Sequence, residues 1–488
     1  MSIFEHLQTH PPRSGPEWGS GGIFGLKYYR GILYYTLAFE AQAYFIDRNG
    51  VKLIYEFEKV GHKPVSGGDT YNAVEVVDDK IYFGGWVHAP AYYRGRSGVG
   101  ATIDFTNKYS HVHCYDINEN IVELVWKESM HNPEKWVGEI SEIIYNPYKD
   151  ELLLARADGY ANLGVYSLDP RSGKTVKVLD EPALKGTHHL DYACFAIHQY
   201  PHGFMGVECI DLIEEEKIIE RPSTLAVDGD TIVNPQVGPV VSSYGWLFTF
   251  VKGGVIVSDI IDKQHYMVRL LDIPYSQLSP LRTKAVNLGG GILVPYNMYT
   301  HALIKPFSEK DREVKRYLNT IVSPSILLYV TPPTVKIAGV FGARVTGVEL
   351  VGDKIVLATN TMANTGRYDA SPFDQGIRGF TVLNQDIITG NSAPLTITIP
   401  GWMIRDKTFG GIPLTGYNMP RLIVHSSNEN KLLIREYHLT LPPITTESEE
   451  ISIHRGKNVI ELNKYTGIVS FKFKKPLSDN DVIVIDLK

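Results

Sequence analysis

Short β-strands follow one another along this chain with no helical pattern between them, and this rhythm most constrains the fold. Between residues 23 and 58 four apolar or β-branched runs occur in succession, IFGLKYY, ILYYTLAFE, AQAYFID and VKLIYEFE. Tight turns or short joins separate them, and comparable quartets recur at intervals of roughly 45 to 65 residues. A repeating unit of four antiparallel strands is typical of a β-propeller blade, so we expect a ring of such blades.

The quartets predict an all-β chain with about seven four-stranded blades, and six or eight blades are the alternatives. The third quartet is the clearest, because turns rich in Asn, Pro, Asp and Gly join its runs EISEIIYN, ELLLARADG, NLGVYSLDP and KTVKVLDE. We interpret LDYACFAIH as the first strand of the fourth blade and LTITIPGW as the last strand of the seventh. A β-sandwich array or a β-solenoid is the competing fold class, but the longer links between quartets favour the propeller.

The pattern predicts two regions. Residues 1–445 are expected to form the propeller, and residues 446–488 either close the last blade or form a small appended β-unit. A single helix is expected at Ser308–Leu318, where SEKDREVKRYL begins with an N-cap serine and has spaced apolar positions.

A turn-rich quartet with a polar residue at the start of each inner strand resembles β-propeller proteins in general. The Tyr- and Ile-rich strands are similar to those of uncharacterised archaeal propellers, and the chain contains 29 Tyr. Neither a recurring Trp-Asp dipeptide nor the double glycine of kelch repeats is present. The resemblance therefore implies a propeller fold and names no repeat family and no function.

Composition limits the classes of partner. A hydrophobic fraction of 43% and a charged fraction of 21% are ordinary for a soluble globular protein. A net charge of -6 without a long basic run argues against nucleic-acid binding. No run approaches the roughly 18 apolar residues of a membrane span. The first residues, MSIFEHLQTHPPRSG, lack the basic start and apolar core of a secretory signal. We therefore predict a cytoplasmic protein without membrane contact.

Three cysteines are present, Cys114, Cys194 and Cys209. None belongs to a C-x-x-C pair, and an odd number is a poor disulfide framework. Cys194 and Cys209 fall on neighbouring expected strands, so a bridge between them is the alternative. Two buried thiols are the favoured interpretation.

Loop lengths predict which face of the ring carries a site. In an up-and-down quartet, the loops between second and third strands share one face with the links between blades. The longest insertions are of this kind, at residues 90–109, 300–323 and 363–376. Because binding groups concentrate in loops on a rigid scaffold, we expect the site at the mouth of the central channel on this face.

Polar residues that open inner strands, close second strands or lie in the insertions on this face would surround the channel mouth. The residues expected to act in catalysis are Glu139, Asp191, His188 and Asp69. The residues expected to bind substrate are His189, Arg156, Asp158, Arg344, Arg421, Trp86, His88, Asn297, Tyr299 and Arg367. Such a mixture of carboxylates, imidazoles, guanidiniums and aromatic rings suits a polyhydroxyl ligand, although strand-opening polar groups often only satisfy the backbone of a turn.

No metal or cofactor is predicted. Adjacent histidines such as His188 and His189 point to opposite faces of a strand, which makes them poor joint ligands. His111 and His113 share a strand face, as a ligand pair would, but they open a third strand away from the axis. A surface or inter-blade role is therefore favoured for that pair. No G-x-S-x-G sequence accompanies a βα pattern, which argues against an α/β-hydrolase.

Two functions follow from these residues. The favoured one is a carbohydrate-active enzyme, a glycoside hydrolase or lyase, in which Glu139 and Asp191 act as acid and base or nucleophile. Its ligand would be a small molecule or an oligosaccharide. The alternative is a non-catalytic scaffold or binding module for a protein or glycan partner, and the sequence leaves a homo-oligomer open.

Overall fold

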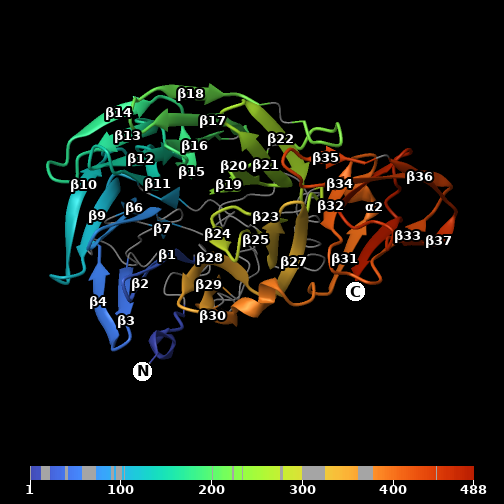
Figure 1. The fold of residues 1–488 in the computed structure, drawn as a ribbon, viewed down its shortest axis with the longest axis horizontal. Helices are drawn as coiled ribbons and strands as arrows, with labels where there is room; N and C mark the ends of the chain where they lie inside the picture. The colour runs from blue at the N-terminus through green and yellow to red at the C-terminus, as the bar shows by residue number, and fades with distance from the viewer. Residues whose placement is uncertain are drawn as a thin grey trace.

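The computed structural model describes residues 2–11, 22–38, 42–57, 73–88, 93–94, 102–103, 105–200, 202–222, 225–233, 235–274, 278–298, 325–360, 377–446 and 448–488. Within these ranges nearly all regular structure is β-strand (Figure 1). The helical elements there are single turns: η1 (Ile3–His6), η2 (Gln385–Ile388) and α2 (Gly401–Ile404). The helix expected at Ser308–Leu318 lies outside the described residues.

Antiparallel sheets arranged around a common axis confirm the propeller (Figure 1). The first blade contains β1 (Ile23–Tyr29), β2 (Ile32–Leu37), β3 (Gln42–Asp47) and β4 (Gly50–Glu56). The second contains β5 (Ala73–Val77), β6 (Lys80–His88), β9 (Lys108–Asp116) and β10 (Ile121–Glu128). The third contains β11 (Glu139–Asn146), β12 (Glu151–Ala157), β13 (Gly164–Leu168) and β14 (Thr175–Leu179). A short pair, β7 (Tyr93–Arg94) and β8 (Thr102–Ile103), lies within the insertion of the second blade.

The remaining blades follow in chain order. The fourth contains β15 (Ala183–His189), β16 (Tyr192–Gln199), β17 (Gly203–Asp211) and β18 (Lys217–Glu220). The fifth contains β19 (Val237–Ser243), β20 (Trp246–Val251), β21 (Gly254–Asp259) and β22 (Gln264–Arg269). The sixth contains β23 (Leu278–Ser279), β24 (Val286–Leu288), β25 (Gly291–Met298), β26 (Ser325–Thr331) and β27 (Thr334–Phe341). The seventh contains β28 (Arg344–Val351), β29 (Lys354–Asn360) and β30 (Arg378–Asn384).

The ring closes where the first and seventh blades meet. The inner strands β1 and β28 lie side by side. The N-terminal segment then pairs with the outer edge of the seventh blade, where the backbone N–H of His10 donates to the carbonyl oxygen of Arg378 at 2.8 Å. The guanidinium of Arg378 donates in return to the carbonyl oxygen of Pro11 at 3.0 Å. The described seventh sheet has three strands, so this segment occupies the place of a fourth.

The fourth blade corrects one strand prediction. Its inner strand is β15, and LDYACFAIH contributes the hairpin turn and the second strand, because His189 pairs directly with Tyr192. The segment ALKGTHH has a glycine and few β-branched residues, so its strand propensity is weak. Packing against the neighbouring inner strands β11 and β19 gives it a strand conformation that the local sequence does not indicate.

The C-terminal strands form two sheets outside the ring (Figure 1). One sheet has the order β31-β39-β33-β37 and contains β31 (Leu395–Pro400), β33 (Arg421–Ser426), β37 (Gly456–Glu461) and β39 (Val482–Leu487). The other contains β32 (Phe409–Pro413), β34 (Asn430–His438), β35 (Ile444–Thr445), β36 (Glu449–Ile453) and β38 (Ile468–Phe473). LTITIPGW thus pairs with the last strand of the chain and not with the seventh blade. The extra β-unit begins near Leu395, earlier than the predicted boundary at residue 446.

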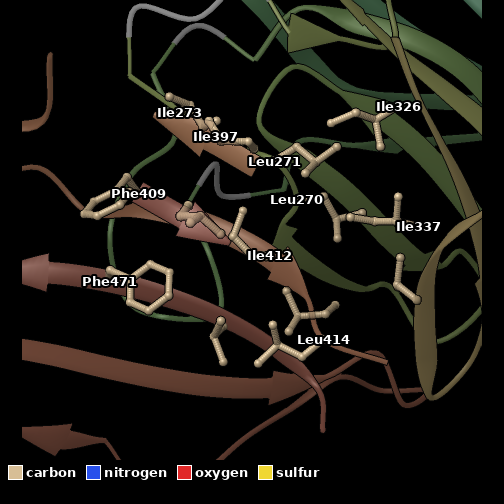
Figure 2. Packing of buried hydrophobic residues seen from close by; sticks show 14 of the residues in the cluster. Leu270, Leu271, Ile273, Ile326, Ile337, Ile397, Phe409, Ile412, Leu414 and Phe471 are labelled. Carbon is tan, nitrogen blue, oxygen red and sulfur yellow. The ribbon is translucent and has the colours of Figure 1, made fainter. Parts of the chain in front are cut away.

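The C-terminal unit packs on the fifth and sixth blades. Figure 2 shows Leu271 and Ile273, which follow β22, against Ile412 and Phe409 of β32. The backbones join there too, because the N–H of Leu271 donates to the carbonyl oxygen of Gly411 at 3.0 Å. Apolar contact and backbone pairing together fix this unit to the ring.

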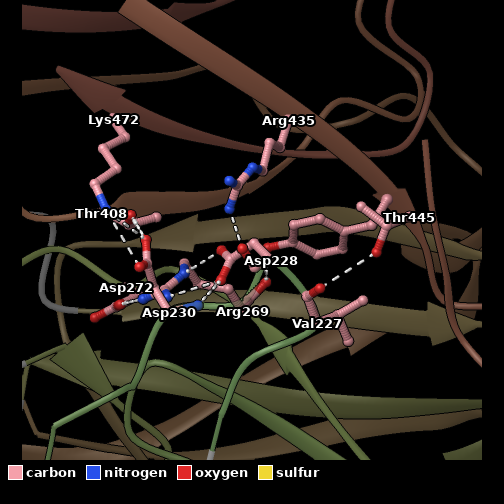
Figure 3. Close-up of polar contacts among 10 residues, drawn as sticks. Val227, Asp228, Asp230, Arg269, Asp272, Thr408, Arg435, Thr445 and Lys472 are labelled. Carbon is pink, nitrogen blue, oxygen red and sulfur yellow. Dashed lines mark hydrogen bonds and ion pairs between the residues drawn. The ribbon is translucent and has the colours of Figure 1, made fainter. Parts of the chain in front are cut away.

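A polar cluster lies beside this apolar contact (Figure 3). Nε of Arg269 is 2.8 Å from Oδ2 of Asp228, and these side chains are 2% and 0% exposed. Arg435 of β34 donates to the carbonyl oxygen of Asp228, and Lys472 of β38 lies 3.2 Å from Asp230. The cluster therefore links the propeller to both β34 and β38.

Cys194 and Cys209 form a disulfide between β16 and β17. They are directly opposite one another in the register of these strands. The expectation of two buried thiols was wrong, because strand order alone does not reveal that two positions share a register. Cys114 is a buried free thiol.

Candidate functional site

A buried ion pair marks the mouth of the ring. Glu139 opens β11, the inner strand of the third blade, and Lys108 opens β9 of the second blade. Nζ of Lys108 lies 2.8 Å from Oε1 of Glu139, and each side chain is 3% exposed. Two neighbouring blades thus contribute opposite charges to one enclosed position.

Three aromatic rings enclose the ammonium group of Lys108. Its Nζ lies 3.8 Å from the ring centroid of Trp86, 4.1 Å from that of Trp136 and 5.3 Å from that of Phe105. A cation at such distances is attracted to the negative face of each ring. Trp136 is held in turn by a hydrogen bond of 2.6 Å from its Nε1 to the carbonyl oxygen of Asp158.

Burial dominates the electrostatics of this pair. It raises the pKa of Glu139 to about 8, against the attraction of Lys108 and with help from the negative charge of Asp158. Burial also lowers the pKa of Lys108, and Glu139 opposes that change. Oε2 of Glu139 has no hydrogen-bond partner among the described atoms. The site therefore favours a protonated carboxyl group with one oxygen unengaged.

Three further polar residues lie around this pair or next to its neighbours. Asp158 follows β12 and is exposed to solvent. Arg282, from the link that leads into β24 on the far side of the ring, lowers the pKa values of both Glu139 and Lys108. Burial lowers the pKa of His198 on β16 to about 4, and Asp158 opposes this shift. Asp158 and Arg282 thus act on Glu139 from the third and sixth blades, and His198 of the fourth blade lies within reach of the charge of Asp158.

Some residues predicted for the site are engaged elsewhere. Arg156 is 1% exposed and lies between the second and third blades, where its NH2 group is 2.5 Å from Oε2 of Glu128. Asn297 is fully buried and accepts a hydrogen bond of 2.8 Å from the N–H of Val345. Arg344 opens β28, is 3% exposed and lies over the ring of Phe24 at 6.0 Å. Glu139, Trp86 and Asp158 are the predicted residues that the structure brings together.

Other predicted residues lie at a different end of the molecule. His188, His189 and Asp191 sit at the hairpin between β15 and β16, which is the opposite end of the inner strands from Glu139. Their expected position at the channel mouth was wrong, because the hairpin was interpreted as the start of a strand. Nδ1 of His189 is 2.9 Å from Oγ of Ser242 there.

Arg421 belongs to β33 in the C-terminal unit, so its expected place at the mouth was also wrong. Its guanidinium lies 2.9 Å from Oδ2 of Asp486, on the paired strand β39. The error follows from assigning the strands after residue 395 to the ring. Strand pattern alone does not distinguish a blade strand from a sandwich strand.

Several predictions fall on parts of the chain that the structure does not describe. Asp69, Tyr299 and Arg367 lie outside the described residues, and His88 is described only as the backbone end of β6. Most of the three long insertions lies outside them too. The strand pairing shows that the described strands on either side of each insertion are the second and third strands of their blade, and the strand ends that border the insertions lie on the face that carries Glu139.

Three residues at or near the Glu139 site were not predicted from the sequence. They are Lys108, Trp136 and His198. The available signal for Lys108 was its position at the start of a third strand, flanked by the aromatic residues Phe105 and Tyr109. Neither Trp136 nor His198 opens an inner strand, so strand order does not point to either residue.

The pair His111 and His113 has an inter-blade position, as the favoured interpretation held. Their Nδ1 atoms lie 2.8 Å apart, and Phe57 of the first blade packs against both rings. No group of three or more His, Cys, Asp or Glu side chains suited to a metal occurs within the described part of the chain. No helix among those residues is long and apolar enough to cross a membrane.

Comparison with solved structures finds distant similarity. Virginiamycin B lyase from Staphylococcus aureus is 10% identical, with 77% of this chain and 99% of that chain covered and a TM-score of 0.44. An exo-β-1,3-galactanase from Phanerochaete chrysosporium is 11% identical, with 88% and 97% covered and a TM-score of 0.28. Similarity at this level carries no argument about function.

Comparison by sequence is more specific. No curated protein matches the chain. One family model, described as an uncharacterized protein conserved in archaea (DUF2139), matches residues 33–368. That match begins in the first blade, ends beyond β29 of the seventh and includes Glu139, Lys108 and Asp158. Because it covers more than half of the sequence, the chain belongs to this archaeal family.

Proposed function

We propose that this protein is a carbohydrate-active enzyme, a glycoside hydrolase or lyase, that acts at the mouth of the ring through Glu139. The observation that supports this is the environment of its carboxyl group. Burial raises the pKa of Glu139 to about 8, so the group retains a proton at neutral pH. A protonated carboxyl can donate that proton to a leaving-group oxygen.

The neighbouring Asp158 supplies the second carboxyl group that such chemistry uses. It directly follows Ala157, which pairs with Glu139 across β11 and β12. Asp158 is exposed whereas Glu139 is 2% exposed. Two carboxyl groups in contrasting environments can divide the roles of acid and base or nucleophile.

Aromatic rings beside these carboxyls provide a surface for a sugar. Tyr160 is 60% exposed, and its ring centroid lies 5.0 Å from that of Trp136. Aromatic faces stack against the apolar faces of sugar rings while nearby polar groups bind hydroxyls. His198 and Arg282 add polar groups on the other sides of the site.

The test is turnover of a panel of oligosaccharides followed by mass spectrometry. The wild type should cleave at least one, and Glu139→Gln and Asp158→Asn should each abolish that cleavage. The matched control is Glu208→Gln. Glu208 is a 3% exposed glutamate whose carboxylate is paired with Arg221 at 2.5 Å, and it lies on β17 away from the mouth. Circular dichroism should show each variant folded. A Glu139→Gln variant that cleaves as fast as wild type would exclude Glu139 from the mechanism.

One observation favours a second function, glycan binding without catalysis. Glu139 is 2% exposed, and Lys108 already holds Oε1 at 2.8 Å. A carboxyl held in this way supports the architecture of the mouth whether or not it transfers a proton. In that case the wild type would bind an oligosaccharide in calorimetry and leave it uncleaved. Tyr160→Ala would then weaken binding, and Glu139→Gln would bind as the wild type does.

A further inference from the structure

A belt of charged side chains surrounds the axis of the ring, apart from the Glu139 site. We call it the axial belt. Five members lie on the inner strands β1, β5, β11, β15 and β28, and the sixth lies just before β24. The members are Lys27, Glu75, Glu142, Lys185, Lys284 and Glu349. Six of the seven blades therefore contribute one charge each, three positive and three negative.

Solvent reaches this belt although the blades enclose it. The side chain of Lys284 is 37% exposed, that of Glu142 is 20% exposed and that of Lys185 is 12% exposed. Inner strands of a propeller face the axis, so this exposure is toward the interior of the ring. A small solute that enters the ring would meet these charges.

Most members of the belt are engaged with one another or with the backbone. Nζ of Lys284 lies 2.6 Å from Oε2 of Glu349, and Nζ of Lys185 lies 3.3 Å from Oε2 of Glu142. The carboxylate of Glu75 accepts the N–H of Val76 at 2.9 Å and that of Tyr145 at 3.2 Å.

Lys27 differs from the other five. Its ammonium makes no hydrogen bond or ion pair with any residue that the structure describes. Lys284 is close to it, because Nζ of Lys284 donates to the carbonyl oxygen of Leu26 at 3.1 Å. Repulsion from Lys284 is the largest cause that lowers the pKa of Lys27, ahead of burial. The carboxylates of Glu349 and Glu75 offset part of this effect without a hydrogen bond to Lys27. Two ammonium groups thus lie close together at the axis, and Lys284 alone of the two is in direct contact with a carboxylate.

We propose that Lys27 and Lys284 form a binding site for a small oxyanion at the axis of the ring. The ligand class is a molecule with one carboxylate or one phosphate group, because both present oxygens that two ammonium groups can bind together. Glu349 and Glu75, the carboxylates that act on Lys27, disfavour a ligand with several negative charges. The site uses none of the residues assigned to the Glu139 mouth and does not rest on the function proposed there.

Isothermal titration calorimetry on the full chain tests this proposal. Sodium phosphate and sodium acetate are titrated separately, with sodium chloride at matched ionic strength as the reference. We expect saturable binding of at least one oxyanion. Saturation by phosphate alone identifies a phosphate ligand class, and saturation by acetate identifies a carboxylate. Heat that matches the chloride reference for both anions would overturn the proposal.

Variants locate the site. Lys27→Met should weaken oxyanion binding about tenfold, whereas Lys27→Arg retains the charge and should bind within a few-fold of wild type. Lys217→Met is the matched control, because Lys217 is an exposed residue of the outer strand β18 and its loss changes the net charge equally. If Lys217→Met and Lys27→Met weaken binding alike, the effect is one of net charge and the axial site is excluded. If Lys27→Arg binds the oxyanion and Lys27→Met does not, the loss of binding in Lys27→Met reflects the missing charge. If neither binds, circular dichroism of both variants shows whether they are misfolded.

Discussion

Nζ of Lys108 lies 2.8 Å from Oε1 of Glu139, and the two residues come from neighbouring blades. Because burial raises the pKa of Glu139 to about 8, Lys108 donates to a neutral carboxyl at pH 7 and to a carboxylate only at higher pH. This contact joins the second and third blades at the mouth, so variants of Glu139 are measured for stability as well as for activity.

Glu139→Gln should raise the free energy of unfolding by about 3 kcal/mol at pH 7, because burial raises the pKa of Glu139 to about 8 and folding must then protonate a carboxyl that is ionised in the unfolded chain. Urea denaturation at pH 7 measures this. The comparison variant is Lys431→Met, which breaks an exposed pair with Glu450 and should change stability by less than about 1 kcal/mol. A loss of stability in Glu139→Gln would show that the carboxyl is ionised in the folded protein and compensates the charge of Lys108.

The titration of His198 should lower stability as the pH is reduced from about 6.5 to about 4, and the raised pKa of Glu139 should act in the opposite direction over most of this range. Burial holds the pKa of His198 at about 4 in the folded state, below its ordinary value of 6.5. Between these pH values the unfolded chain binds a proton that the folded chain does not, so acid favours unfolding. His198 contributes up to about 3 kcal/mol to this loss.

His198→Gln should therefore flatten the dependence of unfolding free energy on pH in this window. Some slope will persist, because burial also lowers the pKa of His113 well below its ordinary value. Urea denaturation at pH 7 and pH 5 compares variant with wild type. An unchanged slope in His198→Gln would mean that this imidazole titrates alike in both states.

Asp228→Asn should destabilise the contact between ring and C-terminal unit. Arg269 loses its fully buried partner and keeps only Asp272, so we expect a loss of about 2 kcal/mol. Thermal unfolding measures the effect. Asp353→Asn is the control, since Asp353 is 81% exposed and paired with Lys354 on the surface. A midpoint shift no larger than that of the control would contradict a stabilising role for the cluster.

Thiol titration tests the Cys194–Cys209 bridge. Protein unfolded without reductant should show one reactive thiol, from Cys114, because the other two cysteines are joined. Protein unfolded and reduced should show three. Three thiols before reduction would mean that the protein as isolated lacks the bridge.

The sequence predicted the propeller because blade strands pair with their neighbours in the chain. EISEIIYN and ELLLARADG, for example, became β11 and β12 with a short turn between them. The strand assignment was wrong where a strand pairs with one that is far away in the sequence. β31 pairs with β39, and no local signal in LTITIPGW distinguishes that partner from a blade strand.

The candidate site was predictable in part for the same reason. Glu139 was found because it opens an inner strand, a position that strand order fixes. Lys108 and Trp136 were missed because their approach to Glu139 depends on how two blades pack, which no strand pattern encodes. His188 and Asp191 were misplaced because a one-strand shift in assignment moves a residue to the opposite face of the ring.

The pairing of His10 with Arg378 has a consequence for how the protein is made. The backbone of His10 bonds to a residue 368 positions later in the chain. On a ribosome, His10 leaves the exit tunnel long before Arg378 is synthesised, so the segment around His10 stays without its partner while the blades emerge. During this time the unpaired backbone of the segment can bind other nascent chains. The last step of folding then forms a contact between residues far apart in the sequence. Ring closure is thus a late event in synthesis, and the N-terminal segment is the part of the chain that waits longest for its partner.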